Sequence, residues 1–129
     1  MALDTDFSVL RGQVIEKIER RRGDRELIFR TTSGETYLMD HDQDCCEHVY
    51  IEDICGDLDD LIGETVMLAE EVSSNVTPDG INTDGLYLSD SFTWTFYKLA
   101  TIKGSVTIRW LGESNGYYSE SVRFRLIED

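Results

Sequence analysis

The chain has 129 residues, of which 40% are hydrophobic, and its formal net charge at pH 7 is −14. A chain of this length and hydrophobic content can bury a self-sufficient core, so it is not a disordered acidic tail, and we expect a single domain over residues 1–129. No segment approaches the roughly eighteen consecutive apolar residues of a membrane-spanning helix, and no calcium loop, P-loop or dinucleotide fingerprint is complete.

The negative charge lies in the middle of the chain. No Lys or Arg occurs from Thr31 to Tyr97, whereas sixteen Asp and Glu residues do. An electric field of this sign repels nucleic acid and anionic membranes, and it attracts cations and basic protein surfaces. The charge therefore predicts a protein partner with a basic surface, no direct binding of nucleic acid and no membrane binding.

Several short segments with strand-like composition follow one another along the first part of the chain. Residues 13–19 and 25–31 flank an arginine-rich turn, which predicts a hairpin with a basic tip, and residues 36–39 continue as a third strand. Residues 48–54 predict another strand.

A turn and a loop separate the next strand from its neighbours. Residues 56–63 have a glycine at each end and acidic residues near the start, which predicts one short helix near residues 57–62. Residues 64–72 predict one more strand. Residues 73–91 contain the only proline, and we expect a long loop there.

The C-terminal part of the chain carries the clearest alternation of hydrophobic and polar residues. The hydrophobic positions of three stretches are Phe92, Trp94 and Phe96; Val106, Ile108 and Trp110; Val122, Phe124 and Leu126. Alternation of this kind places one face of a strand in a core, and turn-like residues separate the stretches. We expect an antiparallel three-stranded meander here, and an all-β fold overall, mainly an antiparallel sandwich or a partly open barrel.

Potential metal ligands are concentrated in residues 41–48. Zinc takes four tetrahedral nitrogen or sulfur ligands, usually from regularly spaced pairs, and the candidates are His41, Cys45 and His48. Their spacing is irregular, and adjacent cysteines in an extended chain point to opposite faces and do not easily form a disulfide. We therefore expect no cofactor, with zinc as the alternative. We expect the cysteines at positions 45, 46 and 55 to be buried. Their number and spacing also predict a cytoplasmic protein.

No complete catalytic motif occurs, so enzymatic activity stays open and a non-enzymatic protein is favoured. A Cys-His pair oriented by an acid has the composition of a nucleophile and its base. Carboxylates beside such a pair are also metal ligands. The alternative of a metal- or Cys-dependent enzyme would use His41, Asp44, Cys45, Glu47, His48 and Asp53.

Acidic residues and one loop are the candidates for binding a partner. The acidic candidates are Asp42, Asp44, Glu47, Glu52, Asp53, Asp57, Asp59 and Asp60. The loop contains Asn115, Tyr117 and Tyr118 among small polar residues, a composition typical of binding loops.

The two tyrosines also predict an alternative small-ligand site together with Trp94 or Trp110. An anionic ligand would need local positive charge in so acidic a protein. The residues available to supply that charge are Arg109, Arg123 and Arg125.

Several segments resemble a family of small uncharacterised proteins from tailed bacteriophages and prophage-bearing bacteria, classed as a domain of unknown function. The resemblance is carried by residues 41–47, 51–58, 93–98, 104–110 and 114–119. It implies a phage context and transfers no catalytic residue. Together with the cytoplasmic location expected from the cysteines, it places the protein in the cytoplasm of a bacterial host cell. We therefore expect a small acidic accessory protein that binds a bacterial protein, as a nucleic-acid mimic or as an inhibitor of a host or defence factor.

Overall fold

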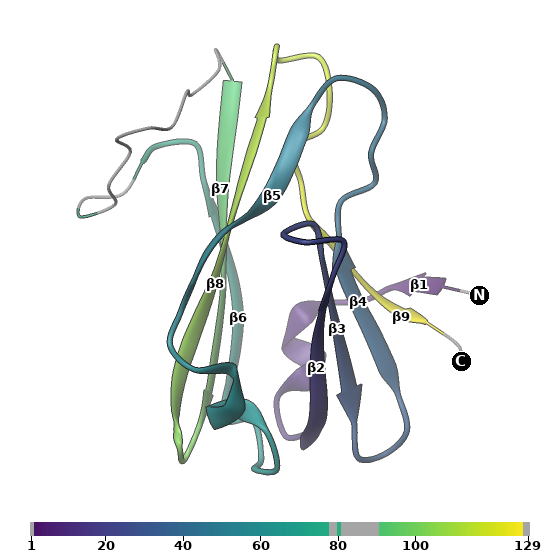
Figure 1. Ribbon diagram of the computed structural model, residues 1–129, viewed down its shortest axis with the longest axis vertical. Coiled ribbons are helices and arrows are strands. Elements are labelled where there is room, and N and C mark those ends of the chain that lie inside the picture. The colour runs from purple at the N-terminus through teal and green to yellow at the C-terminus, as the bar shows by residue number, and fades with distance from the viewer. Residues whose placement is uncertain (1, 78–79, 81–90, 128–129) are drawn as a thin grey trace.

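The computed structural model describes residues 2–77, 80 and 91–127, which form two antiparallel β-sheets packed face to face (Figure 1). The five-stranded sheet has the order β1 (Ala2–Asp4), β9 (Arg123–Ile127), β4 (Thr36–Asp40), β3 (Glu26–Thr31) and β2 (Ile15–Arg21). The four-stranded sheet has the order β5 (His48–Cys55), β8 (Gly104–Ser114), β7 (Ser91–Thr101) and β6 (Leu68–Ser74). The prediction of an all-β antiparallel sandwich is confirmed, and neither sheet closes into a barrel within the described residues.

The N-terminal hairpin has the expected form. β2 and β3 pair through a turn in which Arg22 and Gly23 both have positive φ, and β4 adds to β3 as the third strand. β1 and a 3-10 turn, η1 (Phe7–Leu10), were not expected, because these short segments contain too few residues for a periodic pattern.

The expected short helix is a single 3-10 turn, η2 (Leu58–Leu61). Its N-cap residue, Asp57, accepts a hydrogen bond from the backbone N–H of Asp59, which satisfies one free donor at the start of the turn. Most of the expected 73–91 loop lies outside the described residues.

The expected C-terminal meander is wrong in its last strand. β7 and β8 pair over their whole length, but β9 joins the other sheet between β4 and β1. The ring of Phe124 on β9 stacks on Tyr37 of β4 at 5.2 Å between centroids and meets Phe7 edge-on, so aromatic packing holds β9 in this sheet. The β8–β9 connection therefore crosses from one sheet to the other.

The core lies between the two sheets, and alternation predicts its β8 contribution correctly. Val106, Ile108 and Trp110 all face the core and are buried. On β7 the prediction has the wrong face, because Tyr97 and Leu99 are the core residues and stand opposite Ile108 and Val106.

Trp94 is buried on the outer face of the same sheet. Its indole N–H donates to the Thr77 hydroxyl at 3.2 Å, and the Arg109 guanidinium lies 5.7 Å from its ring centroid. β7 is therefore covered on both faces, and a strand of that kind carries large hydrophobic residues at even and odd positions alike. Alternation alone cannot identify its core face.

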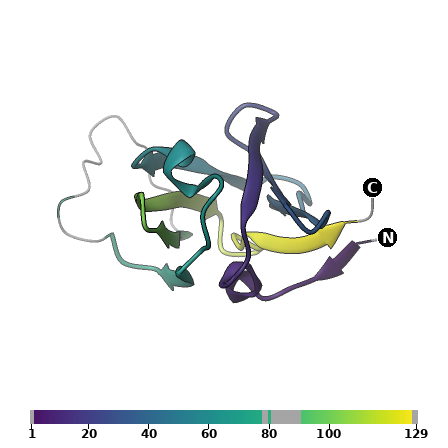
Figure 2. The same ribbon diagram turned by 90° about the horizontal axis from the view of Figure 1, so that it is seen from below.

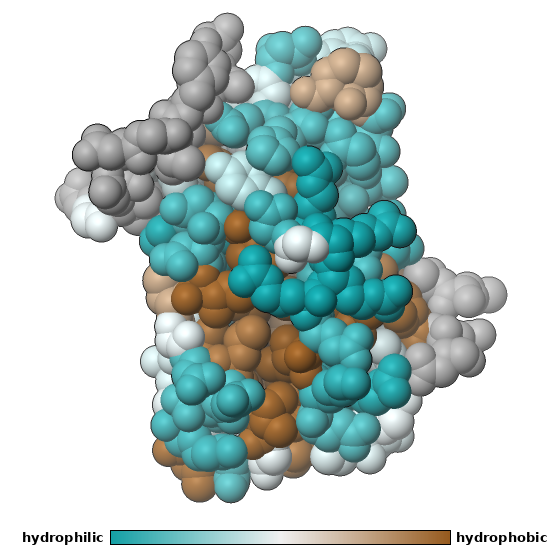
Figure 3. All heavy atoms as spheres, viewed as in Figure 1, coloured by the Kyte–Doolittle hydropathy of each residue, from teal (hydrophilic) through white to brown (hydrophobic). Residues whose placement is uncertain are grey.

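The two edges of the sandwich differ. At one edge β5 approaches the β2–β3 turn, where the Ile51 N–H donates to the Asp24 carbonyl at 2.6 Å. Figure 3 shows hydrophobic side chains between the sheets on this side; partly buried residues that pack against the core include Ile18, Ile54, Leu58 and Ile62. At the other edge η1 lies between β6 and β1 (Figure 2).

A close backbone approach positions the β8–β9 connection. A Cβ atom added to Gly112 on β8 would lie 2.5 Å from the Glu120 carbonyl oxygen, a distance that real Cβ atoms do not show. Glycine at position 112 therefore lets Glu120 pack directly against the strand.

We expect Gly112→Ala to destabilise the fold by about 1–3 kcal/mol, because the added methyl group displaces the backbone at Glu120. Urea unfolding followed by tryptophan fluorescence measures the change. Ser105→Ala, at an exposed position of the same strand, is the control and should stay within about 0.5 kcal/mol of the wild type. Equal stability of Gly112→Ala and wild type would contradict the close approach.

Candidate functional site

An open groove of about 1050 Å³ lies between the two sheets at the edge that carries β6 and η1. Four segments far apart in sequence line it: the stretch from β1 into η1, the β4–β5 connection, the middle of β6, and the end of the β8–β9 connection with the start of β9. Loops and strand edges from both sheets thus meet at one place, which is where binding residues are commonly found.

The groove is strongly acidic. The carboxylates that line it are Asp4, Asp6, Asp42, Asp44, Glu47, Glu70 and Glu71. Arg123 is its one Lys or Arg among the described residues, and that guanidinium binds Asp40 at 2.7 and 3.1 Å and Asp42 at 3.5 Å. The hydrogen bond to Asp40 raises the pKa of Arg123, so this charge is permanent and already neutralised.

Five other groove acids have no such pairing with a described residue. Among the described residues no salt bridge includes Asp4, Asp6, Asp44, Glu70 or Glu71. Asp6 instead caps η1: it accepts a hydrogen bond from the Ser8 N–H, and this interaction with Ser8 lowers the pKa of Asp6. The groove therefore keeps a net negative charge that faces water.

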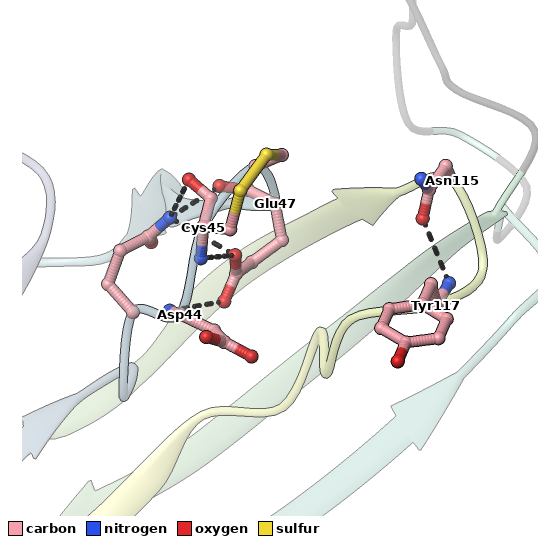
Figure 4. The surroundings of a disulfide bond; sticks show 7 residues. Asp44, Cys45, Glu47, Asn115 and Tyr117 are labelled. Carbon is pink, nitrogen blue, oxygen red and sulfur yellow. Dashed lines mark hydrogen bonds between the residues drawn. A yellow bond between two sulfur atoms is a disulfide. The ribbon is translucent and has the colours of Figure 1, made fainter.

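Glu47 differs from the other groove acids because its carboxylate is turned inward. The side chain is 0% exposed, and it accepts hydrogen bonds from the backbone N–H groups of Asp44 and Cys45, both at 2.9 Å (Figure 4). The Gln43 amide donates to the same carboxylate at 3.2 Å and to the Glu47 backbone carbonyl at 2.8 Å. Residues 43–47 thus form a tight turn around one buried anion.

His41 connects this turn to the other side of the groove. Its Nε2 lies 2.7 Å from a Glu47 carboxylate oxygen, and its Nδ1 lies 2.7 Å from the Ser121 carbonyl oxygen. Each ring nitrogen of His41 therefore lies within hydrogen-bond distance of an oxygen, one on each connection. The β4–β5 and β8–β9 connections are thereby joined.

Burial alone would raise the pKa of Glu47. The hydrogen bonds from His41, Asp44 and Cys45 outweigh that effect and lower the pKa to about 2. The carboxylate is therefore ionised over the whole physiological pH range.

The inner wall of the groove is formed by Glu71 and the core behind it. Glu71 stands opposite Tyr97 in the β6–β7 pairing, so both side chains project toward the space between the sheets. Burial, and after it the negative charge of Glu71, raises the pKa of Tyr97. The buried phenol stays neutral, and Glu71 carries the charge at this wall.

A smaller cavity of about 290 Å³ continues from the groove, since both are lined by Glu71, Ser119, Ser121 and Val122. Tyr118 lines this extension. The Ser114 hydroxyl donates to the Glu120 carboxylate at 2.5 Å and fixes the loop there.

The predicted binding loop is ordered by a local contact. Asn115 accepts a hydrogen bond from the Tyr117 N–H at 2.9 Å (Figure 4). Tyr117 is 83% exposed, and its ring meets Tyr118 edge-on. Of the two predicted tyrosines, Tyr118 belongs to the cavity that extends the groove, and Tyr117 projects into solvent.

The other predicted acids lie outside the groove. Glu52 and Asp53 on β5 contact Arg109 at 2.5 and 3.5 Å. Asp59 and Asp60 lie in η2 and Asp57 is its N-cap, at the end of the sandwich opposite the β4–β5 connection (Figure 1). The acidic stretch is therefore divided into separate surfaces rather than one continuous face.

The predicted environment of the cysteines is wrong. Cys45, Cys46 and Cys55 are exposed rather than buried, and Cys45 and Cys46 are joined by a disulfide although they are adjacent. The turn around Glu47 brings both side chains to the outside of the loop, because the interior is occupied by the carboxylate.

The proposed zinc ligands are not brought together. Both His41 nitrogens are engaged, Cys45 is in the disulfide, and His48 stacks on Tyr50 at 4.4 Å between ring centroids. Within residues 2–77, 80 and 91–127, no three His, Cys, Asp or Glu side chains form a group able to hold a metal ion. Of the residues of the metal- or Cys-dependent enzyme alternative, His41, Asp44, Cys45 and Glu47 meet in the 41–47 turn, whereas Asp53 on β5 contacts Arg109.

The residues of the small-ligand alternative do not form one site, although the Arg109 guanidinium lies 5.7 Å from the Trp94 ring centroid. Trp94 and Trp110 are fully buried and offer no face for stacking. Arg109 pairs with acids on β5, whereas Arg123 and Arg125 both approach Asp40 in the other sheet.

Sequence reasoning missed four of the groove acids. Asp4 and Asp6 lie outside the stretch without Lys or Arg, so the charge count did not select them. Glu70 and Glu71 fell within an expected strand. Successive strand residues face opposite sides of a sheet, so two adjacent acids are only a weak indication of a binding site.

The fold and the groove define a class: a small all-β sandwich with an acidic groove open between its sheets. More particularly, the chain belongs to the family of a domain of unknown function, DUF7448, whose family model matches residues 9–124. This confirms the resemblance to a family of unknown function. No curated protein and no solved structure matches the chain. Among the described residues no helix is both long and apolar enough to span a membrane.

We expect the stability of the protein to fall between pH 4.5 and about 2 because of Glu47. Its pKa is about 2 in the folded protein against an ordinary value of 4.5, so the unfolded chain binds more protons in this window. The stabilisation is complete above pH 4.5 and is lost as the pH falls through the window.

Urea unfolding of wild type and Glu47→Gln at a series of pH values tests this expectation. The difference in unfolding free energy between the two proteins should be largest above pH 4.5 and should shrink toward pH 2. Parallel curves across this range would contradict a buried, ionised Glu47.

Proposed function

We propose that the protein is a non-enzymatic accessory protein whose acidic groove binds a basic segment of a bacterial protein. The observation that carries the proposal is the meeting of carboxylates from three distant segments, represented by Asp6, Asp44 and Glu71, in one groove between the sheets, where none of them has a salt bridge to a described residue. Acids that served only solubility would be spread over the surface and mixed with basic residues.

The shape of the groove supports a peptide-like ligand. Its volume of about 1050 Å³ and its open form suit an extended segment better than a small compact molecule. β6 is an edge strand that pairs with β7 on one side, and its exposed Glu70 and Glu71 discourage uncontrolled strand pairing while attracting Lys and Arg.

Electrostatics would act mainly on recognition and rate. Carboxylates within a concave site reinforce one another and raise the local concentration of a cationic segment. At physiological ionic strength the screening length is about 8 Å, comparable with the width of such a site, so binding should weaken as salt increases.

The finer proposal concerns the biological setting. A protein of this charge in a bacterial host cell suits the role of a phage-type factor that occupies a phosphate-binding surface, as a nucleic-acid mimic or an inhibitor of a host or defence protein. The motive is the acidic groove together with the long stretch without Lys or Arg.

We expect Asp44→Asn/Glu71→Gln to weaken binding of a short labelled peptide, in which Lys and Arg alternate with Ser, by about three- to tenfold. Fluorescence anisotropy at about 0.15 M salt measures the dissociation constant. The matched control Asp59→Asn/Glu64→Gln removes the same residue types and the same charge outside the groove, and should change affinity less than about twofold.

Equal weakening by both double variants would show that net charge rather than the groove attracts the peptide, and would overturn the proposal. The mimicry proposal has its own test. A basic host protein that binds the wild-type chain is first loaded with duplex DNA. The wild-type chain should displace this DNA, and the groove variant should displace less of it than the control variant does.

A further inference from the structure

The Cys45–Cys46 disulfide lies on the outer surface of the turn that encloses Glu47 (Figure 4). Both cysteines are exposed, so a thiol reagent in solution can reach either sulfur. We propose that this pair is a redox site: a dithiol opens the disulfide and thereby loosens the 41–47 wall of the acidic groove.

The position of the disulfide links it directly to the groove wall. The Cys45 N–H donates to one Glu47 carboxylate oxygen, and the Asp44 N–H donates to the other. The same carboxylate contacts His41, which reaches the Ser121 carbonyl oxygen on the opposite connection. A change in the backbone at Cys45 is therefore transmitted to both sides of the groove.

The disulfide acts locally rather than on the whole fold. In the chain-entropy account, the stabilisation from a disulfide grows with the length of the loop that it closes. A bond between adjacent residues closes the shortest loop, so its opening leaves the two sheets intact. What it restricts is the backbone of Cys45 and Cys46, whose dihedral angles regain freedom when the ring opens.

The reaction is a thiol–disulfide exchange with a dithiol as the two-electron reductant. A thiolate of the dithiol attacks one sulfur of the pair, the Cys45–Cys46 bond breaks, and the other cysteine leaves as a thiolate that takes up a proton. The second thiol of the dithiol then attacks the mixed disulfide and releases the remaining cysteine. The protein gains two electrons and two protons, and the dithiol becomes a disulfide.

Cys55 provides an internal comparison. It is exposed at the end of β5, and its thiol donates to an Asp53 carboxylate oxygen at 3.5 Å. Burial, followed by the interaction with Asp53, raises the pKa of the Cys55 thiol, which disfavours the reactive thiolate. Cys55 is therefore not expected to exchange with the Cys45–Cys46 pair.

The test uses the full chain equilibrated with oxidised glutathione, before and after treatment with dithiothreitol. Alkylation of the denatured protein followed by mass spectrometry should find one free thiol before reduction and all three cysteines free after it. Hydrogen exchange of the Asp44 and Cys45 amides should accelerate about tenfold or more on reduction, while β7 and β8 amides stay unchanged.

Two variants keep the test specific. In Cys45→Ser/Cys46→Ser the amides at positions 44 and 45 should exchange hydrogen at the rate of the reduced wild type under both conditions. In Cys55→Ser the same amides should respond to reduction as they do in the wild type. Three free thiols after oxidation, or equal exchange of the Asp44 and Cys45 amides in both states, would overturn the proposal. Neither readout uses peptide binding, so the result is independent of the proposed function.

Discussion

The inward-facing Glu47 carboxylate organises the groove on which the functional argument depends. An ionised group buried at this position is stable only when several donors surround it, and the backbone of the β4–β5 connection folds around it to supply them. His41 completes the arrangement and extends it to Ser121. One buried charge therefore links two connections that each cross between the sheets, and of the exposed groove acids Asp42 and Asp44 lie in one of these connections.

The acids of the central stretch have different physical roles although they look alike in sequence. Glu47 is an interior anion, Asp40 is paired with Arg123, and Asp44 and Glu71 line the groove without a salt bridge to any residue that the structure describes. A charge count treats these residues as equal, whereas only the last group adds to the field that a ligand meets. The acidity of the chain is thus partly structural, and the binding surface is smaller and more sharply placed than the sequence implies.

The sequence predicts the strands well because each is a local property, but it cannot predict how they combine. Alternation identifies the core face of β8 through Ile108, and it fails on β7, where Trp94 is buried on the outer face. The sheet that β9 joins depends on contacts of Phe124 with residues about ninety to a hundred and twenty positions earlier. No local pattern records such contacts, and the same limit hid Asp6 as part of the groove.

The structure of the 41–47 turn bears on how tightly the groove can bind. A flexible wall must be ordered when a ligand arrives, and that conformational cost reduces affinity, whereas a wall already fixed by its own hydrogen bonds avoids most of it. The donors around Glu47 and the ring formed by Cys45 and Cys46 both restrict this segment before any ligand is present. Affinity for a basic segment would then depend on the order of the turn as well as on charge, because the same carboxylates attract less effectively when their positions fluctuate.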